Sequence, residues 1–178
     1  MSKRTLFLND QVVLNKDYDY EERYSIFRQA VRAVIVKDEK VAVQHVTKGF
    51  NGEFYMLPGG GIDFGESVND ALVREIAEEA GVKAEVLGEL GDILEVQYRP
   101  DKDTGLVQLN HGFLCKYVKD LGKTTLTDTE QLKEMKQVWL DIGEAIENVS
   151  KGNDNDYTNF FTRQRDVKYL EIARGLLA

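Results

Sequence analysis

The segment from Leu57 to Val82, LPGGGIDFGESVNDALVREIAEEAGV, is the feature that most restricts how this chain folds. After three consecutive glycines, apolar residues recur at spacings of three and four, the period of an amphipathic helix: Val68, Ala71, Leu72 and Ile76. Ser67 is a favourable N-cap residue, and Gly81 stands where a helix would end. The segment therefore predicts a helix from Ser67 to Ala80 that packs its apolar face on the rest of the protein.

Three acidic residues, Glu75, Glu78 and Glu79, continue this apolar face instead of opposing it. Their mutual repulsion and their place near a helix C-terminus both destabilise the helix. One interpretation is a solvated acidic helix end. The position of the acids in line with the packing face favours a second interpretation, a site where carboxylate oxygens converge on Mg²⁺ or Mn²⁺.

The glycines Gly59, Gly60 and Gly61 match neither of two common phosphate-binding motifs. No Gly-Lys-Ser/Thr follows them, as a P-loop requires, and Phe64 stands where a dinucleotide-binding fingerprint has its third glycine. Two interpretations remain, a flexible turn or a backbone that passes close to a ligand or metal.

The rest of the chain alternates strand-like and helix-like stretches. Strands are predicted at 27–36, 41–46, 54–58, 84–99, 105–118 and 134–142, and helices at 143–149 and 158–177. This order predicts an α/β (α+β) fold in which a mixed β-sheet is sandwiched between helices. We expect residues 1–26 to form an N-terminal extension, within the same domain or at a dimer contact, and residues 27–178 to form one domain.

Composition excludes several classes of protein. A formal charge of −8 without a basic run argues against binding to a nucleic-acid polymer. The chain has no apolar stretch long enough to cross a membrane, and its first ten residues are too polar for a signal peptide. A single cysteine, Cys115, fits a reducing compartment, so we expect a cytoplasmic protein.

The spacing Gly60-x5-Glu66-x7-Arg74-Glu75-Ile76-Ala77-Glu78-Glu79-Ala80-Gly81-Val82 resembles the Nudix box, G-x5-E-x7-R-E-U-x-E-E-x-G-U, in which U is aliphatic. The resemblance implies a Nudix fold and a hydrolase of acid anhydrides. Such an enzyme cleaves the pyrophosphate bond of a nucleoside diphosphate linked to another moiety. That moiety is a nucleotide, a sugar, the ribose of ADP-ribose or a second nucleoside in a dinucleoside polyphosphate.

The resemblance also implies roles for individual residues. Metal ligands would be the carboxylates of Glu75, Glu78 and Glu79 and the carbonyl of Gly60, holding Mg²⁺ or Mn²⁺. Glu66 would be a supporting acid, and Arg74 would orient a neighbouring glutamate through an ion pair.

The general base stays open between Glu75, in the box, and a glutamate of a later loop, either Glu130 or, less favoured, Glu134.

Substrate contacts are expected from Tyr55, where the family often carries tryptophan, and from Tyr98 with the adjacent Arg99. An ordinary strand aromatic is the alternative interpretation of Tyr98. The expected partner is a small nucleotide-type diphosphate, with a homodimer as a further expectation. A Nudix domain that senses nucleotides without catalysis is the alternative function, although such domains usually lose the box acids that this chain keeps.

Overall fold

The computed structural model describes residues 5–8, 24–49, 52–99, 104–151 and 157–178. Its strands are β1 (Thr5–Leu8), β2 (Tyr24–Lys37), β3 (Lys40–Gly49), β4 (Gly52–Met56), β5 (Val82–Arg99), β6 (Thr104–Asp120) and β7 (Met135–Asp141). Its helices are α1 (Val68–Glu75), the π-helical turn η2 (Ile76–Ala80), α2 (Asp128–Leu132), α3 (Ile142–Ser150) and α4 (Tyr157–Leu177). None of the helices in these ranges is long and apolar enough to cross a membrane.

The β2–β3 hairpin shows how local sequence sets the strands. β2 is rich in valine, isoleucine and alanine, residues that suit a buried strand. Its two-residue turn places Asp38 at φ 48° and Glu39 at φ 66°, so both central residues are left-handed, as a type I′ hairpin turn requires. Acidic residues are unusual at both positions, although aspartate tolerates this conformation better than most residues.

The sheet is mixed, with strand order β1-β5-β6-β2-β3-β4, and β7 pairs with the other edge of β3. β1 and β5 run parallel, as do β2 and β6, and the remaining pairs are antiparallel. β2 and β3 pair only next to their turn, from Val36 to Val41, and then diverge. The segment after β4 pairs with β2 instead, where the Val31 N–H donates to the Gly60 carbonyl (2.9 Å) and the Ala33 N–H donates to the Pro58 carbonyl (3.0 Å).

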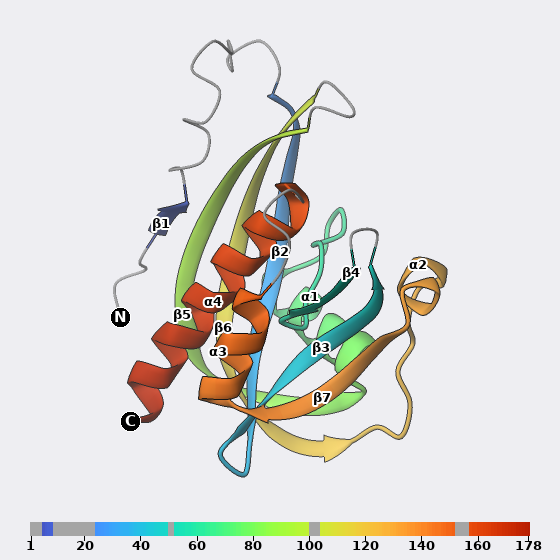
Figure 1. Ribbon diagram of the computed structural model, residues 1–178, viewed down its shortest axis with the longest axis vertical. Coiled ribbons are helices and arrows are strands. Elements are labelled where there is room, and N and C mark those ends of the chain that lie inside the picture. Colours follow the sequence, from blue (N-terminus) through green and yellow to red (C-terminus); the bar gives the residue numbers. More distant parts are fainter. Residues whose placement is uncertain (1–4, 9–23, 50–51, 100–103, 152–156) are drawn as a thin grey trace.

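Helices cover both faces of the sheet (Figure 1). On one face α3 and α4 pack their buried residues on the sheet, among them Val149, Tyr169 and Leu170. On the other face α1 and η2 pack Leu72 and Ile76 against the opposite side of β2 and β6. The predicted mixed sheet between helices is therefore confirmed.

Within residues 27–178 the predicted strands and helices are confirmed in type and approximate bounds, with two differences. The short helix α2 was not expected, because its five residues carry no helical period. The predicted helix from Ser67 to Ala80 is in fact the α-helix α1 followed by η2. Most of the predicted extension, residues 1–26, lies outside the described residues, and the division at residue 27 stays a prediction.

Candidate active site

The Nudix-like segment begins with a well-capped helix. The Ser67 hydroxyl accepts a hydrogen bond from the Asp70 N–H (3.1 Å) and donates to the Asp70 carboxylate (2.7 Å). This arrangement satisfies an N–H that the start of a helix leaves without a partner. At the other end Gly81 adopts φ 62°, the left-handed conformation in which helices commonly stop. The two caps fix where the helix begins and ends, and so fix where its acidic side chains lie.

The last turn of this helix, η2, is π-helical and directly follows Glu75. π-helical turns, which are defined by i→i+5 hydrogen bonds, are rare in proteins. Many of them occur at functional sites. The turn carries Glu78 and Glu79, two of the three acids predicted as metal ligands. The backbone is thus irregular where the sequence places its acidic cluster.

The glycine segment packs directly against these acids. A Cβ atom on Gly60 would overlap the Glu75 carboxylate, so this position accepts only glycine unless that carboxylate moves. The Gly59 N–H donates to the Glu79 carboxylate (2.8 Å). Gly59 also has φ 137°, and a Cβ there would overlap the Val31 carbonyl oxygen. The glycines therefore pack closely on protein groups, and the predicted approach of their backbone to a ligand or metal stays a prediction.

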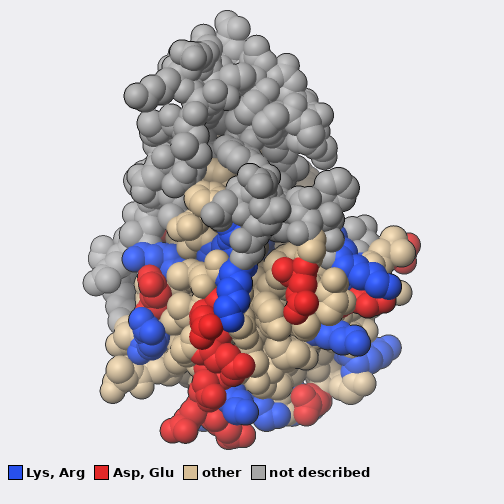
Figure 2. All heavy atoms as spheres, viewed as in Figure 1, with Lys and Arg blue, Asp and Glu red and all other residues tan. Residues whose placement is uncertain are grey.

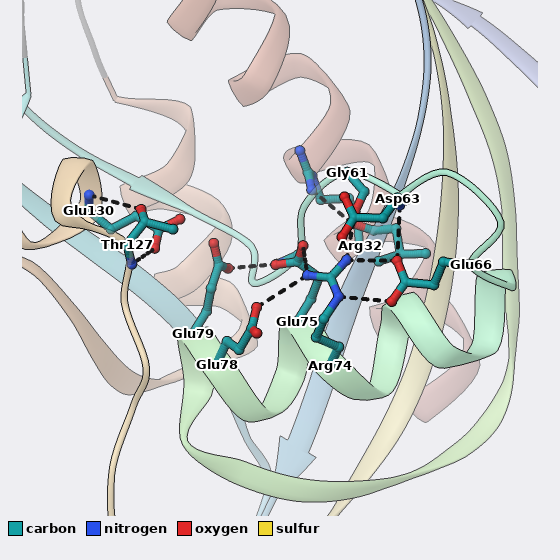
Figure 3. A network of polar contacts seen from close by, with 12 residues as sticks. Arg32, Gly61, Asp63, Glu66, Arg74, Glu75, Glu78, Glu79, Thr127 and Glu130 are labelled. Atoms are coloured by element: carbon teal, nitrogen blue, oxygen red, sulfur yellow. Dashed lines mark hydrogen bonds and ion pairs between the residues drawn. The ribbon is translucent and has the colours of Figure 1, made fainter.

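Arg74 links the acids to one another (Figure 3). Its Nη1 lies 2.7 Å from Glu75 Oε1 and 3.2 Å from Glu78 Oε2. Its Nε and Nη2 bond the two oxygens of Glu66 at 2.8 and 2.9 Å, and Nη2 also donates to the Gly61 carbonyl at 2.9 Å. The ion pair that the family resemblance implied for Arg74 is present, and it extends to three glutamates.

Burial and hydrogen bonds shift the pKa values of these acids in opposite directions. Glu75 is 8% exposed and Glu79 is 5% exposed. Desolvation raises the pKa of Glu75, and it raises the pKa of Glu79 to about 8 although the Gly59 N–H and Arg32 oppose the shift. In contrast, hydrogen bonds from Arg74 lower the pKa of Glu66 to about 2. Burial therefore acts against negative charge at Glu75 and Glu79, whereas Glu66 is held as a carboxylate.

The donor atoms at this site fit a hard divalent cation. Glu75, Glu78 and Glu79 offer only oxygen ligands, the kind that Mg²⁺ and Mn²⁺ prefer. The Gly60 carbonyl accepts one hydrogen bond, from Val31, which leaves its second lone pair. A nearby cation would also stabilise the buried carboxylates in their charged form.

The acids are not arranged as a closed metal cage. Within the described ranges no three histidine, cysteine, aspartate or glutamate side chains converge as a metal-binding group. Arg74 bonds Glu75 and Glu78, and Gly59 bonds Glu79. These bonds use one oxygen of each acid, so the second oxygen of each carboxylate is left for a cation.

Glu130 and Glu134 lie outside the helix and differ in environment. Glu130 caps α2, since its carboxylate accepts from the Thr127 N–H (2.7 Å), and its charge contributes to the raised pKa of Glu79. Figure 3 shows Glu130 on the far side of Glu79 from Arg74. Glu134 instead pairs with Lys48 on the surface. The structure brings Glu130, but not Glu134, to the acidic cluster.

The predicted substrate contacts are only partly described. The Tyr55 ring stacks on His45 with the ring centroids 4.4 Å apart. The backbones of Tyr98 and Arg99 end β5, but their side chains lie outside the described residues. Their predicted roles stay predictions.

Sequence reasoning missed a group of buried charges between β2, β5 and α4. Arg165 bonds Asp166 (2.7 Å) and Glu95 (3.1 Å), and Asp166 accepts the N–H of Leu57 (2.9 Å), two residues before the glycines. Arg32 lies in the centre of β2 and is 7% exposed. The one available signal was a charged residue inside the apolar run AVRAVIV.

Comparison with known proteins places this site in a family. The model of the NUDIX domain matches residues 26–163. The chain belongs to the Nudix family. The match spans both the box helix and the buried arginine of β2.

Two curated relatives carry names that describe pyrophosphate hydrolysis. An RNA pyrophosphohydrolase of Ruthia magnifica is 30% identical over 133 residues, 69% of this chain and 73% of that protein. An ADP-ribose pyrophosphatase of Methanocaldococcus jannaschii is 41% identical over 75 residues, 42% of this chain and only 41% of that protein's length. The family and both names support the predicted enzyme class, a hydrolase acting on pyrophosphate bonds.

A solved structure supports the fold. The crystal structure of an ADP compounds hydrolase superposes with a TM-score of 0.58 at 22% identity, covering 84% of this Nudix chain and 72% of the other. At 22% identity the similarity shows only that the two proteins share a fold. It agrees with the Nudix fold expected from the box.

Proposed function

We propose that this chain is a divalent-metal-dependent pyrophosphohydrolase that cleaves a nucleoside diphosphate linked to another moiety. The observation that carries the proposal is the packing of buried Glu75 and Glu79 against the glycine segment. A fold gains nothing in stability from two buried acids placed beside each other. Their cost is explained if they hold a cation during turnover.

In this proposal Mg²⁺ or Mn²⁺ is held by Glu75, Glu78, Glu79 and the Gly60 carbonyl. A bound cation supplies charge that polarises the phosphorus centre, stabilises the leaving oxygen and lowers the pKa of water. Arg74 would hold Glu75 (2.7 Å) and Glu78 (3.2 Å) in position through one oxygen of each, which leaves their other oxygens for the cation. Glu66, held by two bonds, keeps Arg74 on the helix surface.

We assign the general base to Glu130. One of its oxygens is bonded by the Thr127 N–H, which fixes the carboxylate beside the cluster. Glu75 is less suited to proton transfer, because it is committed both to Arg74 and to the proposed metal. A base outside the metal ligands leaves the coordination intact while it accepts the proton.

The names of the relatives guide the choice of substrates for testing. ADP-ribose and an RNA 5′ triphosphate end come first, followed by nucleotide sugars, dinucleoside polyphosphates and nucleoside triphosphates. The RNA substrate also tests the expectation that this acidic chain does not act on a nucleic-acid polymer. A small soluble substrate, a cytoplasmic location and a homodimer remain parts of the proposal.

The experiment is a hydrolysis screen of this panel with Mg²⁺ and Mn²⁺, comparing the wild type with Glu79→Gln. We expect metal-dependent release of a phosphate-bearing product from at least one substrate. In the variant we expect a loss of about 10²-fold or more, because one metal ligand is gone. A wild type without metal-dependent turnover on any substrate contradicts the proposed function, and full activity of the variant contradicts the metal assignment.

A further inference from the structure

Arg32 is a buried cation that the box motif does not account for. It lies in the centre of β2 among alanine and valine residues and is 7% exposed. Its Nη1 donates to the carbonyl of Val31 (2.8 Å), and its Nε is buried without a hydrogen-bond partner in the described part of the chain. A buried N–H of a charged group is unfavourable without a partner, so this atom points to a ligand or to water.

The backbone of β2 places Arg32 at the proposed metal site. Its two neighbours, Val31 and Ala33, are the residues that bond the glycine segment. A Cβ on Gly59 would lie only 3.0 Å from the Arg32 Cα. Arg32 also acts electrostatically on both Glu75 and Glu79, and Figure 3 draws it with them.

Asp166, Glu79 and Glu95 attract Arg32 electrostatically, but none of them is hydrogen-bonded to it in the described part of the chain. Asp166 and Glu95 both bond Arg165, and among the described residues no carboxylate is bonded to Arg32. Burial first, and then the neighbouring Arg165, lower the pKa of Arg32 to about 10, where the side chain is still charged at neutral pH. Because the carboxylates near Arg32 bond other groups, its buried Nε–H is left for an acceptor from outside the described chain.

We propose that Arg32 binds the diphosphate group of the substrate, donating its free N–H to a phosphate oxygen next to the metal-binding acids. The proposal rests on the proposed function and extends it to a substrate-binding residue outside the Nudix box. The planar guanidinium suits phosphate oxygens because its N–H groups form a fixed fork. The diphosphate would then lie between opposite charges of the protein, with the cation on the carboxylate side and Arg32 on the β2 side.

A purely structural role for Arg32 makes the opposite prediction for metal binding. If Arg32 serves only to support Glu79, its loss should weaken the metal site and the substrate site together. If it binds phosphate, its loss removes a positive charge near Glu75 and Glu79, so a divalent cation should bind equally well or more tightly. The affinities for metal and for diphosphate should therefore change independently.

The test measures both affinities in Arg32→Gln. Mn²⁺ binding is followed by electron paramagnetic resonance of the free ion. Binding of methylenediphosphonate, whose P–C–P bridge resists hydrolysis, is followed by calorimetry with Mg²⁺ present. Arg174→Gln, an exposed position on the last turn of α4, is the matched control for loss of one positive charge.

We expect Arg32→Gln to weaken diphosphonate binding by about tenfold or more, with Mn²⁺ affinity unchanged or higher. Arg174→Gln should change neither affinity. Unchanged diphosphonate binding in Arg32→Gln overturns the proposal. A parallel loss of Mn²⁺ and diphosphonate affinity also overturns it, in favour of a structural role.

If Arg32→Gln does not fold, Arg32→Lys distinguishes between phosphate binding and a structural role in the same way. The lysine keeps the charge but lacks the fork of N–H groups, so diphosphonate binding should weaken while Mn²⁺ binding is retained. Wild-type diphosphonate affinity in Arg32→Lys contradicts the proposal. Because the diphosphonate is not hydrolysed, this result is independent of the substrate screen that tests the proposed function.

Discussion

Single ionisable residues in this protein are buried where an apolar residue would suit the fold better. Glu79 is 5% exposed, and burial raises its pKa to about 8. Glu66, at the start of the same segment, is held in its charged form by two bonds from Arg74. Acids of one segment thus differ in ionisation because of burial and partners, a pattern typical of catalytic sites.

Glu130 provides a residue-scale prediction for the chemical step. We expect Glu130→Gln to lower kcat by about 10²- to 10⁴-fold with KM and Mn²⁺ affinity little changed, because the amide cannot accept the proton of water. Steady-state kinetics and a Mn²⁺ titration measure this. Glu134→Gln, in the same loop region but paired with Lys48, should keep wild-type kcat. A kcat for Glu130→Gln close to the wild-type value would contradict this assignment and favour Glu75 as the general base.

The ion pair between Glu66 and Arg74 makes the free energy of unfolding depend on pH. Its pKa is lowered to about 2 in the folded protein, so the folded state binds fewer protons than the unfolded state in acid. The stabilisation from the bonds to Arg74 is complete above the ordinary pKa and is lost as the pH falls toward 2. Denaturant unfolding at pH 7 and pH 3 should show a smaller acid-induced loss in Glu66→Gln than in the wild type. An equal loss in both proteins would contradict the ion pair.

At the scale of elements, the sequence predicted most of the strands and helices because their patterns are local. The period of Val68, Ala71, Leu72 and Ile76, with the caps Ser67 and Gly81, gave the box helix its bounds. The π-helical turn was not predictable, because the spacing of the apolar residues fits an ordinary α-helix through the same positions. The capping of α2 by Glu130 was missed because that helix has only five residues.

Gly60 tests the contact between the glycine segment and the helix. In Gly60→Ala the new Cβ would overlap the Glu75 carboxylate, the flexible end of a side chain that can move aside. We therefore expect activity to fall by about tenfold or more while the melting temperature changes by only a few degrees. Gly143→Ala, where the Cβ meets open space, should affect neither. Full activity in Gly60→Ala would contradict the close packing of Glu75 on this glycine.

At the scale of the whole molecule, α4 is tied to the active-site segment by a buried charge. Asp166, 0% exposed, accepts the N–H of Leu57 and bonds Arg165, which reaches Glu95 on β5. The sequence could not reveal this link, because its members are separated by up to 109 positions and only the folded chain brings them together. Arg32 was missed although its charge inside the apolar run AVRAVIV was a signal, because that run does not show which groups surround it.

Asp166→Ala should destabilise the protein by about 3–5 kcal/mol, since it leaves Arg165 buried with one partner fewer and the Leu57 N–H without one. Urea unfolding of the variant measures this loss. Glu171→Ala, an exposed position on the same helix, should change the free energy of unfolding by no more than about 0.5 kcal/mol. A similarly small effect in Asp166→Ala would show that α4 is not coupled to the glycine segment in this way.

The central claim is that the buried acids of the Nudix box bind a divalent cation. The most direct measurement is a Mn²⁺ titration of the wild type and Glu79→Gln, following free Mn²⁺ by electron paramagnetic resonance. We predict binding by the wild type and a loss of affinity of about tenfold or more in the variant, while both proteins remain folded. Equal Mn²⁺ affinity in the two proteins would contradict the claim.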